Sequence, residues 1–152
     1  HSRVARSNIA AFTMLGAQVT LVAPPTLLPA HIAQWPVRVS HSLDEVIAST
    51  DVLYMLRLQS ERMDQGLIPN LGEYGNRFGL TDQRAQKLQS TAVVMHPGPM
   101  NRGVEMHVDP ADLPNSLIHK QVANGVSVRM AVLFDVLARG GELNSLKEEG
   151  VA

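Results

Sequence analysis

His96-Pro97-Gly98-Pro99-Met100-Asn101-Arg102-Gly103 directly follows the apolar run Ala92-Val93-Val94-Met95. The apolar run is typical of a buried strand in a parallel sheet. The two prolines end that strand, because neither can donate a sheet hydrogen bond and each fixes φ at about −65°. Gly98 has no Cβ, so a ligand can approach its backbone closely. Because open α/β sheets bind ligands beyond the carboxyl ends of their strands, residues 96–103, the proline turn, are predicted to bind a small ligand. A stiff turn without a ligand would have the same sequence.

Composition and charge exclude several classes of function. The chain has 152 residues, of which 45% are hydrophobic and 18% charged, as in one water-soluble domain. A net charge of −1 and 4% aromatic residues argue against binding to nucleic acid. Disulfides and zinc–thiolate sites are excluded because the chain has no cysteine. No histidine pair has metal-ligand spacing and no glycine-rich dinucleotide loop is present, so we expect neither a metal nor a cofactor.

The sequence also carries an expectation about localisation. No apolar run approaches the roughly 20 residues that a membrane span requires, and no signal peptide is visible. We therefore expect a cytoplasmic protein with no membrane partner.

Helical and strand patterns alternate along the chain, which predicts an α/β fold. We expect a doubly wound, Rossmann-like, mostly parallel sheet flanked by helices within a single domain. The predicted strands are 18–23, 37–40, 51–56 and 92–95. The predicted helices are 9–15 ended by Gly16, 28–35, 42–48, 81–88 and 116–139, the last with a break at Asn124-Gly125 and an end at Gly140-Gly141. Residues 63–79 are predicted to be mostly a mobile loop, and residues 140–152 a flexible polar tail.

Arg57 and Gln59 follow a predicted strand and form a candidate site for a carboxylate. A guanidinium group can donate two parallel hydrogen bonds to a carboxylate, and the amide adds a further donor. An ion pair of Arg57 with Glu61 or Glu45 at the surface is the alternative.

Three further residues have candidate roles that the sequence leaves open. Arg3 precedes a helix N-terminus, which is a favourable place for an anion, although a solvated terminal arginine has the same pattern. Arg102 suits either a ligand contact or a structural ion pair. His96 is expected to be a buried, hydrogen-bonded residue rather than a general base.

Four segments taken together resemble the aspartate-binding half of aspartate carbamoyltransferase catalytic chains. They occur in the order and spacing of that family and span most of the sequence, and together they are specific where any one alone is not. The segments are 1–8 (HSRVARSN), 54–62 (YMLRLQSER), 96–105 (HPGPMNRGVE) and 121–131 (QVANGVSVRMA).

The resemblance implies an activity and a set of binding residues. It implies transfer of a carbamoyl group from carbamoyl phosphate to the α-amine of L-aspartate, the committed step of pyrimidine synthesis. By the family's pattern, Arg3 would hold the α-carboxylate of aspartate, and Arg57 and Gln59 its side-chain carboxylate. The backbone of Pro97, Gly98 and Pro99 would receive the carbamoyl end. No residue of this chain is expected to act as a catalytic acid or base.

The resemblance also implies a larger protein. Residues 1–139 would form the aspartate-binding domain, and the carbamoyl phosphate domain would precede His1, so we expect no turnover by this chain alone. The final helix, about 126–139, would pack on that other domain through Val128, Val132, Leu133 and Val136. The resemblance further implies a homotrimer of full-length chains, with regulatory or dihydroorotase partners as a possibility. The predicted loop at residues 63–79 is a candidate for closure over aspartate.

Two alternatives differ in their chemistry. Ornithine carbamoyltransferase must accept a cationic amine and typically carries cysteine in its proline turn, whereas this chain has no cysteine. A non-catalytic α/β ligand-binding module is the second alternative.

Overall fold

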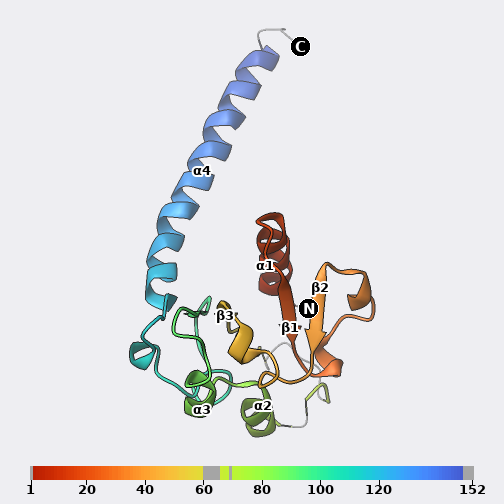
Figure 1. The fold of residues 1–152 in the computed structure, drawn as a ribbon. Coiled ribbons are helices and arrows are strands. Elements are labelled where there is room, and N and C mark those ends of the chain that lie inside the picture. The colour runs from red at the N-terminus through yellow and green to blue at the C-terminus, as the bar shows by residue number, and fades with distance from the viewer. Residues whose placement is uncertain (1, 60–65, 69, 149–152) are drawn as a thin grey trace. The chain divides into compact units, whose positions relative to one another are not determined.

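The computed structural model describes residues 2–59, 66–68 and 70–148 (Figure 1). It contains two compact units, His1–Ile118 and His119–Ala152. The regular elements of the first unit are α1 (Arg3–Met14), β1 (Val19–Val22), β2 (Val37–Ser40), β3 (Val52–Tyr54), α2 (Leu71–Phe78), α3 (Asp82–Ala85) and β4 (Val93–Met95). Helix α4 (Ile118–Glu148) supplies the described part of the second unit.

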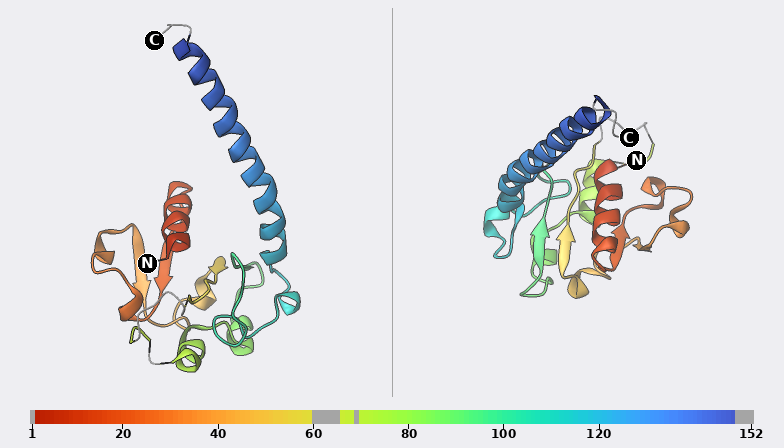
Figure 2. Two further views of the ribbon diagram at one scale, coloured as in Figure 1. Left: turned by 180° about the vertical axis from the view of Figure 1, so that it is seen from behind. Right: turned by 90° about the horizontal axis from the view of Figure 1, so that it is seen from above.

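The strands form two parallel pairs, which confirms the α/β class and the parallel direction. In the first pair β1 lies beside β2, with Val19 opposite Val37. In the second pair β3 lies beside β4, with Tyr54 opposite Met95, and Figure 2 shows this pair in yellow and green. Within the described residues no strand hydrogen bonds join the two pairs, so the expected single sheet consists here of two two-stranded sheets.

Helix α1 connects the two pairs by packing. The ring of Phe12 on α1 meets the ring of Tyr54 on β3 edge to face, with 6.3 Å between ring centroids. The same helix also contacts β1. Because edge-to-face aromatic pairs add to the energy of apolar burial, this contact helps to hold the first pair against the second.

The hydrophobic core lies around β3 and β4. Its members come from these strands and from the segments that precede and follow them, so the most buried side chains surround the predicted ligand-binding edge. They are Leu43, Ile47, Leu53, Met55, Leu80, Val94, Met106, Val108, Leu113 and Ile118.

Helix α1 begins earlier than its sequence pattern predicts. It starts at Arg3 rather than Ile9, because the Ser2 hydroxyl accepts a hydrogen bond from the Ala5 amide at 3.1 Å and caps the helix. Its predicted end is confirmed, since Gly16 follows the helix with φ of +82°, a conformation that glycine adopts without a steric penalty.

Two predicted helices are wrong. Residues 28–35 form only a 3₁₀ turn at Ile32–Gln34, which follows a separate turn at Pro25–Leu27. Residues 42–48 form a turn and a 3₁₀ segment at Ile47–Ser49. Within this segment the Asp44 carboxylate pairs with Arg84 and Lys87 and does not lie at a helix N-terminus.

The predicted loop at residues 63–79 is corrected in part. Helix α2 occupies its second half and is capped by Asn70, whose Oδ1 accepts a hydrogen bond from the Glu73 amide at 2.7 Å. The prediction for residues 63–65 and 69 lies outside the described residues.

Helix α4 continues through both of its predicted interruptions. It passes through Asn124-Gly125 and through Gly140-Gly141, so the predicted end at residue 139 is wrong. An interior glycine costs about 1 kcal/mol relative to alanine, which is too little to end a helix of this length. By length and composition alone, the stretch Ile118–Ala138 could cross a membrane. Core helices of soluble proteins also meet this criterion. Sequence patterns predicted no such stretch.

The apolar side chains of this helix that are expected to pack on the other domain are exposed in this chain. Their exposed fractions lie between 55% and 62% for Val128, Val132, Leu133 and Val136.

Candidate functional site

The ends of β3 and β4 place two of the predicted binding segments side by side. The Met55 amide donates to the Met95 carbonyl at 2.9 Å, just where both parallel strands end. Residues 57–59 therefore leave the sheet at the same edge as the proline turn, as expected for a ligand site in an α/β fold. The Asn101 Nδ2 amide donates to the Leu58 carbonyl at 3.0 Å and joins the two segments directly.

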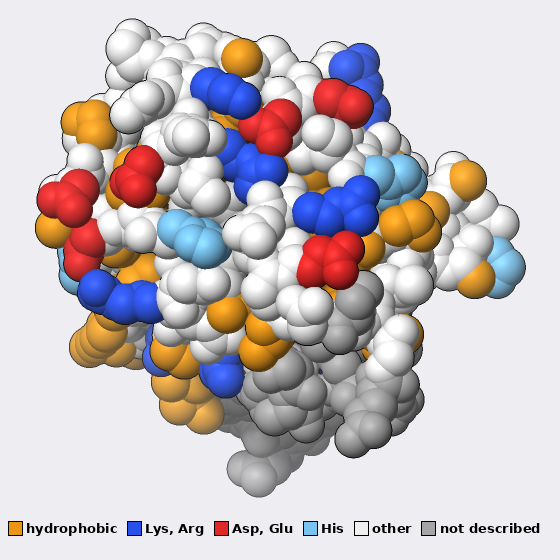
Figure 3. Space-filling model, turned by 90° about the horizontal axis from the view of Figure 1, so that it is seen from below, with side chains coloured by type: hydrophobic (Ala, Val, Ile, Leu, Met, Phe, Trp, Pro, Cys, Tyr) orange, Lys and Arg blue, Asp and Glu red, His pale blue; other side chains and the backbone are white. Residues whose placement is uncertain are grey.

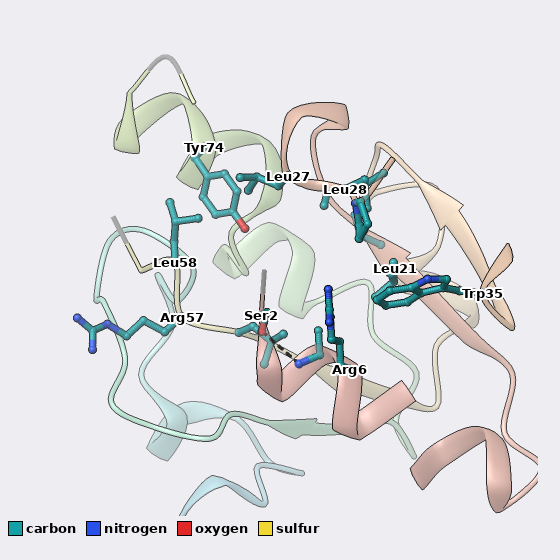
Figure 4. A pocket seen from close by; sticks show the side chains of 14 residues that line it. Ser2, Arg6, Leu21, Leu27, Leu28, Trp35, Arg57, Leu58 and Tyr74 are labelled. Carbon is teal, nitrogen blue, oxygen red and sulfur yellow. Dashed lines mark hydrogen bonds between the residues drawn. The ribbon is translucent and has the colours of Figure 1, made fainter. Parts of the chain in front are cut away.

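The side chains of Arg57 and Gln59 differ in burial. Arg57 is half-buried and interacts within the chain, whereas Gln59 is exposed. Figure 4 shows the Arg57 guanidinium group directed away from the Arg6 guanidinium group. Two of the three predicted aspartate-binding residues, Arg57 and Gln59, thus lie at the same strand end.

The proline turn exposes its backbone at Gly98. This residue has φ of +63°, and a Cβ built on it would meet no atom within 4 Å. The Gly98 amide donates to His96 Nδ1 at 2.9 Å. The carbonyls of Pro97 and Gly98 accept no hydrogen bond from the part of the chain that the structure describes, so they can accept one from a ligand NH₂ group.

His96 and Glu105 form a buried pair beneath this turn. Both residues are 0% exposed, and His96 Nε2 lies 3.3 Å from Glu105 Oε1. Because Nδ1 accepts from the Gly98 amide, the ring proton that faces Glu105 is on Nε2, which donates to the carboxylate. His96 is therefore a satisfied buried residue, as predicted.

The Glu105 carboxylate also holds the backbone of the turn. Its Oε1 accepts a hydrogen bond from the Asn101 amide at 2.6 Å. Burial acts to raise the pKa of Glu105, but the hydrogen bonds from His96 and Asn101 outweigh it, so this pKa lies below the ordinary value of 4.5. The carboxylate is charged at neutral pH.

The N-terminus of α1 lies across a cavity from Arg57. This cavity of about 180 Å³ is lined by Ser2 and Arg6 of the α1 segment and by Arg57 and Leu58 (Figure 4). Arg3 is exposed at the first position of α1 and does not line the cavity. The structure therefore places residues 57–59 next to the proline turn. It also places the N-terminus of α1, which carries Arg3, near the end of β3.

Sequence patterns did not single out the other polar residues of this cavity. The Arg6 guanidinium carbon lies 5.5 Å from the centre of the Trp35 ring, a cation–π contact between segments far apart in the chain. Figure 4 shows the Tyr74 hydroxyl directed toward the cavity. Burial, together with the charge of Glu105, raises the pKa of Tyr74 to about 12, so this hydroxyl keeps its proton. No spacing rule connects residues 6, 35 and 74.

Arg102 has a structural partner. Its Nη1 lies 2.8 Å from Asp109 Oδ2 in an exposed ion pair, which answers the question that the sequence left open. On the face drawn in Figure 3, basic and acidic side chains are interspersed rather than separated into areas of one sign. Within the described residues, no three histidine, aspartate or glutamate side chains are grouped to hold a metal ion.

The chain is similar to known proteins over nearly its whole length. A family profile described as "Aspartate/ornithine carbamoyltransferase, Asp/Orn binding domain" matches residues 1–136. The aspartate carbamoyltransferase catalytic subunit of Mycobacterium ulcerans is 53% identical over 152 residues, which are 100% of this chain and 47% of that protein. The corresponding subunit of Thermobifida fusca is 51% identical over 150 residues, which are 99% of this chain and 47% of that protein. The chain thus spans about half the length of these curated relatives.

Solved structures show the same relation. Aspartate transcarbamoylase from Trypanosoma cruzi in complex with carbamoyl phosphate matches with a TM-score of 0.63 and 31% identity, over 76% of this chain and 39% of that one. Its complex with N-(phosphonacetyl)-L-aspartic acid matches with a TM-score of 0.62 and 31% identity, over the same shares. The profile, the sequence relatives and the solved structures agree, and the chain belongs to the aspartate/ornithine carbamoyltransferase family, whose Asp/Orn-binding domain it contains.

Proposed function

We propose that the protein containing this chain transfers a carbamoyl group from carbamoyl phosphate to the α-amine of L-aspartate. The products are N-carbamoyl-L-aspartate and phosphate, and the reaction is the committed step of pyrimidine synthesis. The observation that carries the proposal is the contact between residues 57–59 and the proline turn, made by the 3.0 Å hydrogen bond from Asn101 to Leu58. The names of the similar proteins support the same reaction.

Aspartate is a dianion and needs cationic groups for both of its carboxylates. We assign the side-chain carboxylate to Arg57 and Gln59, and the α-carboxylate to Arg3 at the N-terminus of α1. The unpaired amides of that helix end add a favourable field for an anion. Each charged hydrogen bond contributes about 1.5–3 kcal/mol, so the two sites together account for binding at millimolar concentration or better.

The proline turn receives the carbamoyl end in this proposal. The Pro97 and Gly98 carbonyls accept hydrogen bonds from the carbamoyl NH₂ group and so fix its plane. The amine nitrogen of aspartate then forms a bond to the carbonyl carbon, while the bond from that carbon to the phosphate oxygen breaks. Phosphate leaves with the electron pair, and the amine loses one proton.

Orientation is the main contribution that this domain makes to the rate. When both carboxylates are held, the amine has few positions relative to the carbonyl carbon, and well-oriented reactants gain several kcal/mol over free ones. None of the residues assigned here binds phosphate. We therefore assign phosphate binding to the remaining half of the protein and expect this domain alone to give no turnover.

The assembly is part of the proposal. We propose a cytoplasmic homotrimer of full-length chains, to which regulatory or dihydroorotase partners can be added. The exposed apolar side chains of α4 support association with further protein, because a soluble domain rarely leaves so many valines and leucines in water.

The test is an assay of the full-length protein with carbamoyl phosphate and either L-aspartate or L-ornithine. We expect N-carbamoyl-L-aspartate from aspartate and no product from ornithine, together with no product from residues 1–152 alone. A preference for ornithine would replace the proposal with the sister activity. Binding of either amino acid with no carbamoylated product would indicate a non-catalytic module.

A further inference from the structure

A continuous series of hydrogen bonds runs from residues 57–59 to the exposed tip of the proline turn. The Leu58 carbonyl accepts from Asn101 Nδ2 at 3.0 Å, and the Asn101 amide donates to Glu105 Oε1 at 2.6 Å. The same oxygen lies 3.3 Å from His96 Nε2, and His96 Nδ1 accepts from the Gly98 amide at 2.9 Å. We call this series the relay.

The central residues of the relay are buried, as a positioning role requires. His96 and Glu105 are 0% exposed, and Leu58 is 6% exposed, so its central groups are shielded from water. Hydrogen bonds in such a low-dielectric setting are stronger than exposed ones, and leaving one partner unpaired is costly. The relay therefore resists relative movement of its two ends.

Asn101 is the member that joins the two segments. Its side chain reaches a carbonyl that lies between Arg57 and Gln59, whereas its backbone amide belongs to the turn. The relay's other hydrogen bonds, among His96, Gly98 and Glu105, lie within residues 96–105.

We propose that Asn101 is a positioning residue that sets the distance between the aspartate-binding segment and the carbamoyl-binding carbonyls. The inference deepens the proposed function and rests on it. Asn101 contacts neither substrate in this proposal, so its effect falls on the simultaneous fit of both substrates and not on the binding of either alone. Misplacement by about 1 Å can lower a rate about 100-fold, so even a small shift of one segment is measurable.

The experiment uses two variants of the full-length protein. Asn101→Asp keeps the size of the side chain but replaces the NH₂ donor with an oxygen that repels the Leu58 carbonyl, and Asn101→Ala removes the group. Asn115→Asp is the control, because Asn115 is also half-buried and its Nδ2 likewise donates to a backbone carbonyl, that of the exposed Ser90. For each protein we would measure kcat, the Kd of carbamoyl phosphate, the Kd of N-(phosphonacetyl)-L-aspartic acid, and Tm.

We expect both Asn101 variants to lower kcat at least about tenfold and to weaken binding of the bisubstrate compound by a similar factor. The Kd of carbamoyl phosphate should stay within about twofold of the parent value, because binding of that substrate alone does not depend on the distance between residues 57–59 and the proline turn. The control should leave kcat and both Kd values within about twofold, whatever its Tm.

Two results would overturn the inference. If the Asn101 variants keep the parent kcat and the parent affinity for the bisubstrate compound, or if they change no more than the control, the relay does not position the substrates. If they lose affinity for carbamoyl phosphate as strongly as for the bisubstrate compound, Asn101 stabilises the proline turn itself and does not set the distance between the two segments. A parent protein that gives no N-carbamoyl-L-aspartate in the same assay would instead reject the proposed function, and the inference with it.

Discussion

The two strand pairs of this domain differ in how firmly they are packed. In the β3–β4 pair, Leu53 and Val94 are 7% and 2% exposed and belong to the hydrophobic core. In the β1–β2 pair no strand residue is buried. The relay and the proline turn both attach to the buried pair, so the groups that need fixed positions are built on the better packed half.

The β1–β2 pair has a different role. Its strand β1, together with the N-terminus of α1, lines the cavity beside Arg57, where Leu21 and Val22 supply apolar surface. A half-buried pair can adjust to a ligand at smaller energetic cost than a close-packed core can. The comparison therefore predicts that substitutions near β3–β4 are the more damaging.

The largest loss of stability is expected at Gly79, where there is no space for an added methyl group. A methyl group on Gly79, just after α2, would press against the carbonyl oxygens of Val104 and Gly75, which are backbone atoms and cannot rotate away. Gly79→Ala should therefore cost about 4 kcal/mol of unfolding free energy, or prevent folding. Gly16→Ala, at the end of α1, meets no atom and should cost only about 1 kcal/mol for its positive φ. Urea unfolding measures both, and equal costs would contradict the comparison.

The strands themselves provide a second test. Leu53→Ala in β3 removes a side chain that is 7% exposed and should cost about 3 kcal/mol, because the core can close only partly around the cavity. Leu21→Ala in β1 removes a half-buried side chain and should cost about 1 kcal/mol. A larger loss for Leu21 would show that the β1–β2 pair is the firmer half.

The comparison extends to ligand binding at the end of β3. Arg57→Ala removes two charged hydrogen bonds to the proposed aspartate carboxylate and should lower kcat/KM for aspartate about 100-fold, equivalent to about 3 kcal/mol. Binding of carbamoyl phosphate should change little. Arg77→Ala is the control, because Arg77 is an exposed arginine of α2 that pairs with Glu73 on the same helix. Steady-state kinetics of the full-length protein would distinguish the two, and equal values for both variants would remove Arg57 from the site.

The smallest effect is the pH dependence of the unfolding free energy that arises from Asp44. Hydrogen bonds from Arg84 and then Lys87 lower the pKa of Asp44 from 3.8 to about 2. A lowered carboxyl pKa stabilises the fold above the unfolded value and loses that contribution as the pH falls through the folded value. Because Asp44 is 42% exposed, solvent screening reduces the gain to about 1 kcal/mol.

The variant Asp44→Asn measures this gain. It should be less stable than the parent by that amount at neutral pH, and the difference should vanish between about pH 4 and pH 2. Urea unfolding at several pH values provides the measurement, and a difference that persists at the lowest pH would assign the effect to packing.

Local patterns predicted much of the fold. The strands were predictable because short β-branched runs such as residues 19–22 and 37–40 have few other stable conformations. Capping by Ser2 and Asn70 was missed, since these side chains act only once the following backbone is already helical. The glycines of α4 predict a break at Asn124-Gly125 and an end at Gly140-Gly141, but the length of the apolar pattern outweighs their low helix propensity.

The candidate site was predictable only where its residues lie in one segment. The proline turn and the strand-end position of Arg57 follow from sequence because both depend on neighbouring residues. The contact of Asn101 with Leu58 joins positions 43 apart, and the pairing of Arg6 with Trp35 also depends on the tertiary fold. No periodicity encodes such contacts, so only the structure could supply them.

The amides of Gly98 and Asn101 donate to side chains and not to other backbone groups. Loop amides ordinarily exchange their hydrogen with solvent quickly. These two amides donate to an imidazole nitrogen and a carboxylate that are buried from water. In deuterated buffer they should therefore retain hydrogen far longer than the adjacent loop amides. Their resonances would report on the geometry of the turn before any substrate is added.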